Sequence, residues 1–301
     1  MHLINANSQF RESEQDPVSI WTELSPIPFR VEYVDANGVA TRTLRAGNPG
    51  AAAVVFLHGT SGHLEAFARN IVAHAEYDVH AIDMLGHGYT GKPGRPYEIA
   101  DYVAHLVDYL DAEGVQQAHI VGESLGGWVG ARTAIDHPDR VLSLQLLCAG
   151  GTVANPVVMD RIRTSTKNAV SSDDIELTRK RLRLLMADDA NATEELVEVR
   201  HAIYHQPDFV ANVDNLLSLQ DMERRQRNLL RPEHLARITQ PTLVIWGRQN
   251  PFGEVPEASA MHEAIPGSQL EIFENCGHWP QHEQAERYNL RSLGFLRKAG
   301  V

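Results

Sequence analysis

The stretch that decides the fold is HIVGESLGG, residues 119–127, where a short apolar run leads through Gly-x-Ser-x-Gly into a helical pattern. That pentapeptide alone occurs by chance in many proteins, but between a strand and a helix it is typical of a nucleophile turn. The turn strains the serine backbone, and side chains two residues to either side would collide with neighbouring backbone. Ser124 is therefore the predicted nucleophile, with an ordinary glycine turn as the alternative.

Strand and helix patterns alternate on both sides of this stretch. Runs that are apolar at nearly every residue indicate strands buried on both faces of a parallel sheet. We expect such strands at residues 51–57, 79–82, 119–121, 141–147, 243–246 and 270–273, and helices at residues 99–110 and 125–135. Two alternating runs, residues 30–35 and 40–44, flank Asn37-Gly38 and predict a β-hairpin. The sequence therefore predicts an α/β fold, a mostly parallel twisted sheet with helices on both faces.

The alternation stops after residue 147. No strand pattern is found between about residues 155 and 230, and this segment contains helix-start signals such as Thr193-Glu194-Glu195. Because the strand pattern resumes at Pro241, the segment interrupts one sheet instead of starting a second one. We predict a core formed by residues 1–150 and 231–301, with residues 151–230 inserted as an all-helical cap.

A serine hydroxyl is a poor nucleophile at neutral pH unless a base takes its proton, so a histidine is expected in a loop after a later strand. Among the 15 histidines, His278 fits this role. Its loop follows the strand at residues 270–273 and precedes the last helical pattern. The acid that orients such a histidine is expected after the strand at residues 243–246, and the residue standing there is Asn250.

Asn250 can accept a hydrogen bond from the imidazole, but it supplies no negative charge and can hold the wrong tautomer by donating instead. In the serine-protease triad the corresponding change from Asp to Asn lowers turnover by about 10⁴-fold. The loop after residue 147 reads CAGG and offers no acid. Three explanations stay open: the chain is a trapping variant, another acid serves the histidine, or the chemistry tolerates a neutral group.

The attacked carbonyl oxygen needs fixed hydrogen-bond donors, because negative charge builds up on it. The segment at residues 56–62, FLHGTSG, ends a predicted buried strand close to the nucleophile. We assign the oxyanion hole to the backbone amides of Thr60 and Leu125, and we expect Gly59 and Ser61 to contact the substrate. Without Ser124, a plain turn after a strand would be the preferred interpretation of this loop.

Several motifs stand in the order found in one superfamily. They are Leu57-His58-Gly59, Asp83-Met84-Leu85-Gly86-His87-Gly88, Gly122 to Gly127, His137-Pro138-Asp139-Arg140-Val141, Pro241 to Gly247 and Cys276-Gly277-His278-Trp279. With these motifs the chain resembles an α/β-hydrolase fold enzyme over nearly its full length. Within that superfamily it is most similar to the meta-cleavage product hydrolases, which hydrolyse a carbon-carbon bond in vinylogous 1,5-diketones formed by ring opening of catechols.

The resemblance implies two substrate-binding residues and reveals one departure. Arg200 matches the arginine that binds the substrate carboxylate, and Trp279 matches the tryptophan that borders the dienoate. A guanidinium can hold a carboxylate with two hydrogen bonds, although a helix salt bridge for Arg200 and core packing for Trp279 are the alternatives. Many members of the family carry an asparagine before the nucleophile, whereas this chain carries Glu123, which leaves the role of that position open.

Composition limits the partners of the protein. The chain has 301 residues, with 27 Lys and Arg against 39 Asp and Glu, a net charge of −12 that argues against nucleic acid and anionic membranes. We expect a small-molecule substrate and no metal or other cofactor, and a homo-oligomer is compatible with the sequence. Two cysteines, Cys148 and Cys276, cannot form a disulfide scaffold, and residues 1–5 lack signal-peptide features, so we expect a cytoplasmic protein.

Three functions compete. The first is a carbon-carbon bond hydrolase acting on a 2-hydroxy-6-oxo-dienoate-like acid through Ser124 and His278, with Arg200 binding the carboxylate. The second is a carboxylesterase or lactonase on the same scaffold, and the third is a binding protein that has lost turnover because of Asn250. The first is favoured, since a binding protein has no reason to keep the serine, the histidine and both oxyanion segments.

Overall fold

The computed structural model describes residues 19–299, so residues 1–5, considered above for a signal peptide, lie outside the described range. Within it, eight strands form one sheet in the order β1-β2-β4-β3-β5-β6-β7-β8. The strands are β1 Phe29–Ala36, β2 Val39–Gly47, β3 Ala53–Leu57, β4 Asp78–Ile82, β5 Ala118–Glu123, β6 Val141–Leu147, β7 Thr242–Gly247 and β8 Gln269–Phe273. Strand β2 pairs antiparallel with β1 and β4, and all other pairs are parallel. The predicted α/β class is confirmed.

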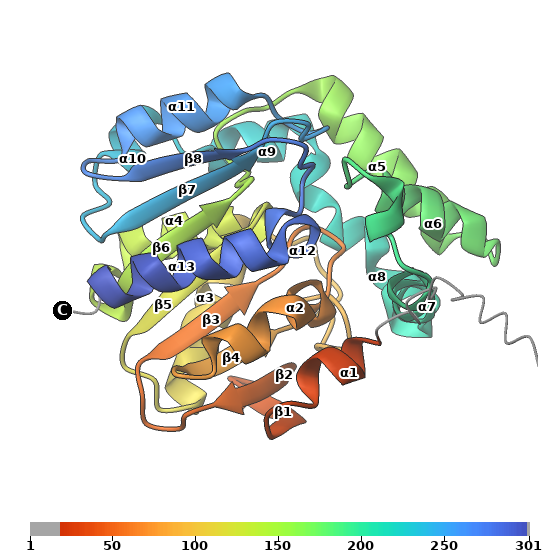
Figure 1. Ribbon diagram of the computed structural model, residues 1–301. Coiled ribbons are helices and arrows are strands. Elements are labelled where there is room, and N and C mark those ends of the chain that lie inside the picture. The colour runs from red at the N-terminus through yellow and green to blue at the C-terminus, as the bar shows by residue number, and fades with distance from the viewer. Residues whose placement is uncertain (1–18, 300–301) are drawn as a thin grey trace, which may run out of the picture.

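The helices connect and cover these strands (Figure 1). They are α1 Ile20–Leu24, α2 Ala68–Ile71, α3 Ile99–Ala112, α4 Leu125–Asp136, α5 Pro156–Val170, α6 Ile175–Arg183, α7 Glu194–Tyr204, α8 Pro207–Leu216, α9 Met222–Asn228, α10 Pro232–Leu235, α11 Val255–Ala264, α12 Pro280–Glu283 and α13 Ala285–Ala299. No helix of residues 19–299 combines the length and the apolar character needed to cross a membrane.

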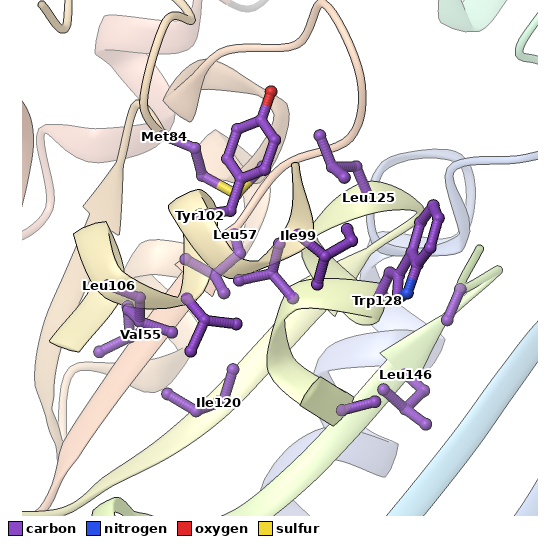
Figure 2. Packing of buried hydrophobic residues seen from close by; sticks show 14 of the residues in the cluster. Val55, Leu57, Met84, Ile99, Tyr102, Leu106, Ile120, Leu125, Trp128 and Leu146 are labelled. Atoms are coloured by element: carbon purple, nitrogen blue, oxygen red, sulfur yellow. The ribbon is translucent and has the colours of Figure 1, made fainter. Parts of the chain in front are cut away.

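The sheet has a hydrophobic core on each face because side chains alternate along its strands. Along β3, Val55 and Leu57 belong to the core that α3 and α4 cover, while Val54 and Phe56 belong to the core that α2 and α13 cover. Figure 2 shows the first core, where residues of β3, β5 and β6 pack against Tyr102 and other side chains of α3 and α4. Full burial of such an aliphatic side chain contributes roughly 1.5–3 kcal/mol.

Residues 148–241, all of them described, contain no strand. Helices α5 to α9 fill most of this segment and lie together beyond the carboxyl ends of the parallel strands (Figure 1). Helix α5 contacts α6, α7 and α8, so these helices form one layer. This layer stands over the loops that carry the predicted nucleophile and histidine.

The turn between β5 and α4 has the strained geometry that its sequence predicts. Ser124 adopts a φ of 53° and a ψ of −110°, a conformation that L-residues rarely adopt. A Cβ on Gly126 would stand 2.1 Å from the carbonyl oxygen of Leu57, and one on Gly122 would stand 2.3 Å from the Gly126 backbone. Only glycine therefore lets α4 begin this close to β3 and β5.

Replacing Gly126 by alanine should destabilise the protein, because the new methyl group meets backbone that cannot move aside. We expect the free energy of unfolding to fall by about 3 kcal/mol or more. Gly294, an exposed glycine of α13 with open space around it, provides the control. Gly294→Ala should raise stability by roughly 0.5–1 kcal/mol. Equal effects of the two changes in denaturant unfolding would contradict the close approach described here.

Candidate active site

Two cavities meet at Ser124, which lines both of them together with Thr60 and His278. The first, called cavity A, is also lined by Gly59, Glu123, Arg181, Arg200 and Trp279. The second, called cavity B, is also lined by Leu125, Trp128, Asn250, Arg225 and Glu257. The structure thus brings most of the predicted site residues together where the strands end and the helical layer begins.

His278 is held from one side by Asn250. The imidazole Nδ1 lies 2.8 Å from Asn250 Oδ1, and the same oxygen accepts the backbone N–H of Phe252 at 3.1 Å. A backbone N–H can only donate, so the atom facing the ring is the amide oxygen and Nδ1 carries the hydrogen. Asn250 therefore fixes the tautomer in which Nε2 is free to act as a base, but it places no charge beside the ring.

The other ring nitrogen faces Glu123. His278 Nε2 lies 3.0 Å from Glu123 Oε1, and the carboxylate is 1% exposed. No hydrogen bond of standard geometry reaches either of its oxygens in the described part of the chain. Within residues 19–299, no hydrogen bond joins the Ser124 hydroxyl to His278 either. An acidic group thus meets the histidine from a position that the sequence left unassigned.

The proposed oxyanion amides are available in this structure. Among the described residues, neither the Thr60 N–H nor the Leu125 N–H has a hydrogen-bond acceptor. Leu125 is the first residue of α4, where backbone N–H groups have no partner within the helix. Both residues line cavity B beside Ser124, so a carbonyl carbon at the serine can present its oxygen to them.

Arg200 is buried in cavity A at 1% exposure, with one guanidinium nitrogen lacking any hydrogen-bond partner. Its Nε donates to His63 Nε2 at 3.3 Å, and His63 Nδ1 lies 2.9 Å from Glu65. Burial lowers the pKa of His63, which suits a neutral ring that accepts from Arg200 and donates to Glu65. The guanidinium also lies 5.2 Å from the ring centre of Trp279. These contacts orient Arg200 toward the cavity.

A second buried arginine, Arg181, was not found from the sequence. Its Nε donates to Thr166 at 3.3 Å, one of its other nitrogens has no partner, and it lines cavity A. Burial lowers the pKa of Arg181 to about 10. Within residues 19–299, neither Arg181 nor Arg200 forms an ion pair with a carboxylate. The signal in the sequence was its spacing from Thr178 and Leu182, which share the buried face of α6.

The remaining predicted contacts divide into two groups. Gly59 and Trp279 line cavity A, as expected for residues that face a substrate. Ser61 lines neither cavity: its side chain is fully buried and accepts the Tyr204 hydroxyl at 3.1 Å. Ser61 adopts a φ of 58°, in the left-handed region. Its place is in the packing between this loop and α7.

Comparison with known proteins places this architecture in a family. The family defined by the alpha/beta hydrolase fold matches residues 52–285, so the chain belongs to it and is a hydrolase of that fold. A 2-hydroxy-6-oxononadienedioate/2-hydroxy-6-oxononatrienedioate hydrolase from Burkholderia vietnamiensis is 31% identical over 265 residues, which are 82% of this chain and 87% of that protein.

A solved structure of a meta-cleavage product hydrolase from Pseudomonas fluorescens IP01 is 27% identical, with a TM-score of 0.75 over 91% of this chain and 98% of the other. The resemblance to meta-cleavage product hydrolases is therefore confirmed. The dihydrolipoyllysine-residue acetyltransferase component of an acetoin cleaving system from Cupriavidus necator is 30% identical, covering 86% of this chain and 67% of its own length. Because relatives of similar identity differ in their reactions, the substrate is best argued from the site.

The unpaired buried guanidinium of Arg181 lowers the stability of the protein but can bind an anion. Arg181→Met should therefore raise the free energy of unfolding and lower the affinity for a carboxylate. We expect the free energy of unfolding to rise by about 1 kcal/mol. The affinity for a small carboxylate such as acetate should fall at least about 10-fold. Arg183, an exposed residue of the same helix, provides the control, because Arg183→Met should change neither quantity. If calorimetry shows unchanged carboxylate binding in Arg181→Met, Arg181 does not bind the carboxylate.

Proposed function

We propose that this protein hydrolyses a carbon-carbon bond in a 2-hydroxy-6-oxo-dienoate-like acid. The observation that carries the proposal is the pair of buried arginines in cavity A, neither within ion-pair distance of a carboxylate in the described residues. Glu123 is the one carboxylate of residues 19–299 that lines this cavity, so burying two cations there is unfavourable unless a further anion joins them. A simple ester needs no such anion, whereas the carboxylate of a dienoate supplies it.

The two cavities suggest how the substrate lies. Its carboxylate would contact Arg181 and Arg200 in cavity A, with the conjugated chain against Trp279. The C6 carbonyl would then stand at Ser124, with its oxygen toward the Thr60 and Leu125 amides, and the group beyond C6 would enter cavity B. This orientation uses the unpartnered nitrogens of Arg181 and Arg200 and the two open amides.

The reaction then divides into two stages. First the dienol becomes a ketone: it loses its hydroxyl proton and gains a proton at C5. Next Ser124 Oγ attacks C6 while its proton passes to His278 Nε2, and the electron pair of the C5–C6 bond leaves with the dienoate fragment. Each oxyanion donor stabilises the tetrahedral intermediate by about 3 kcal/mol. Water finally hydrolyses the acyl-serine. These two stages use the serine, the histidine, the two amides and both arginines of cavity A, whereas hydrolysis of a simple ester uses neither arginine.

Mixing the protein with a coloured ring-cleavage product should remove the long-wavelength absorbance of that compound, because cleavage interrupts its conjugation. Ser124→Ala should slow this loss by at least about 10³-fold. Ser25, an exposed serine distant from Ser124 in the sequence, serves as the control, and Ser25→Ala should behave as the parent. If the parent leaves the colour intact but hydrolyses simple nitrophenyl esters rapidly, the esterase alternative replaces this proposal.

Cavity B offers a cation to the distal end of the substrate. Arg225 Nε donates to the Val153 carbonyl at 2.8 Å, and the guanidinium lies 5.0 Å from the ring centre of Trp128. Burial lowers the pKa of Arg225 to about 10, and no carboxylate of the described residues forms an ion pair with it. Glu257 lines the same cavity, and burial raises its pKa. We propose that the distal group carries a hydrogen-bond acceptor such as a second carboxylate.

Arg225→Met should separate two kinds of substrate. For a dienoate with a distal carboxylate, kcat/KM should fall about 10- to 100-fold, because a buried hydrogen bond to a charged group is lost. For a dienoate with a distal phenyl group the change should stay below about threefold. Arg161→Met, at an exposed residue of α5, is the control. Equal losses on both substrates would show that Arg225 supports the cavity wall and does not select the substrate.

We infer that the protein works in the cytoplasm. Cys148 and Cys276 are both free and buried, and burial raises the pKa of each thiol. Such thiols are structural and inert, and they fit a compartment where disulfides do not form.

Homo-oligomerisation stays a prediction that solution mass measurements can decide.

A further inference from the structure

Asn250 contacts His278 but provides no negative charge beside the imidazole. In a serine, histidine and acid triad, a carboxylate at Nδ1 stabilises the imidazolium that forms when the serine is deprotonated. Here Nδ1 donates to a neutral amide oxygen that the Phe252 N–H holds in place. A triad built on these residues alone would form an imidazolium with no adjacent negative charge at Nδ1.

The contact on the opposite side of the ring requires a proton. Because Nδ1 carries a hydrogen, Nε2 of a neutral ring has a lone pair that points outward. A carboxylate oxygen 3.0 Å away would then face that lone pair, which is repulsive. The contact is favourable when one proton lies in it, either as imidazolium beside carboxylate or as imidazole beside carboxylic acid. In both forms the pair holds one exchangeable proton.

The surroundings of Glu123 fit such a pair. A Cβ on Gly59 would stand 2.4 Å from Oε2, so the missing side chain of Gly59 makes the room that the carboxylate occupies. The carboxylate is buried, and no other hydrogen bond holds it in the described residues. The other charged groups that line cavity A are Arg181 and Arg200, and both carry a positive charge.

We propose that Glu123 and His278 act as one acid–base pair, with Glu123 as a catalytic residue that supplies the negative charge absent at Asn250. This inference rests on the proposed function for its chemical steps, but the shared proton itself does not. Such a pair implies a substrate that must gain a proton on a carbon atom before Ser124 attacks it.

In the proposed steps, the Glu123–His278 pair first gives a proton to the substrate and then accepts one from Ser124. The substrate binds as a dienolate, and the pair gives its proton to C5, where the dienolate electron pair forms the C–H bond. The pair is then a carboxylate beside neutral imidazole, so Nε2 can accept the Ser124 proton as the Oγ electron pair bonds to C6. The imidazolium formed lies 3.0 Å from the Glu123 carboxylate. It returns this proton to the leaving dienolate, and the carboxylic acid product of acyl-serine hydrolysis reloads the pair.

Substituting Glu123 by glutamine tests this role, because glutamine keeps the shape and removes the charge. Dienoate turnover by Glu123→Gln should fall about 100-fold. Glu254→Gln removes the same charge from an exposed residue four positions after Asn250, and it should behave as the parent. Thermal unfolding of each variant shows whether it is folded. Unchanged turnover in a folded Glu123→Gln would overturn the proposal.

A double substitution separates charge from packing. Asn250→Asp restores a carboxylate at Nδ1, so in the Glu123→Gln background it should recover at least about tenfold in turnover. In the parent the same change should alter turnover by less than about threefold. A merely structural Glu123 would show no such rescue. Equal effects of Asn250→Asp in both backgrounds would mean that the two positions do not share one role.

Nitrogen-15 NMR of histidine-labelled protein tests the shared proton without any substrate. At pH 7 the Nε2 signal of His278, assigned by its loss in His278→Gln, should show a protonated or proton-sharing nitrogen in the parent. In Glu123→Gln it should shift to the position of a bare acceptor nitrogen, while Nδ1 stays protonated. A bare Nε2 in the parent would contradict the shared proton even if dienoates are cleaved. A protonated Nε2 in a protein that cleaves no dienoate would leave the pair intact and refute only the proposed reaction.

Discussion

The close approach of α4 to β3 positions the residues that we propose as catalytic. Gly126 has no side chain where the Leu57 carbonyl lies, and this contact sets the start of α4 against the end of β3. The proposed nucleophile Ser124 and the amide of Leu125 lie at the start of that helix, and Thr60 follows the end of that strand. One backbone contact therefore sets the serine relative to both of the amides that we propose as oxyanion donors. Strain at Ser124 is tolerated because buried strands and helices surround it on both faces of the sheet.

Much of this arrangement follows from local sequence. Apolar runs in alternation with helical patterns predicted the sheet, and the Gly-x-Ser-x-Gly turn and the loop of His278 were found because each follows a strand directly. Arg181 was missed because its helix also carries Arg179 and Arg183. Its spacing places it on one face with Thr178 and Leu182, and only the fold shows that this face is covered. The place of Ser61 could not be predicted either, since it depends on a contact with Tyr204, which is distant in the sequence.

The contact of Glu123 with His278 depends on residues distant in the sequence. It requires the last loop of the sheet to return beside β5, and it requires a glycine at position 59 to leave space for the carboxylate. Neither condition can be predicted from the residues of the turn that carries Ser124. The net charge of −12 was equally uninformative about the site, where two buried arginines and one buried glutamate face the same small volume.

A crystal structure of Ser124→Ala with a bound dienoate tests most directly how the substrate lies across the two cavities. We expect the C1 carboxylate against Arg181 and Arg200, the C6 carbonyl oxygen between the Thr60 and Leu125 amides, and C5 on the side of Glu123 and His278. A dienoate bound the other way round, with its C1 carboxylate at Arg225 and its distal group at Arg200, would contradict this orientation.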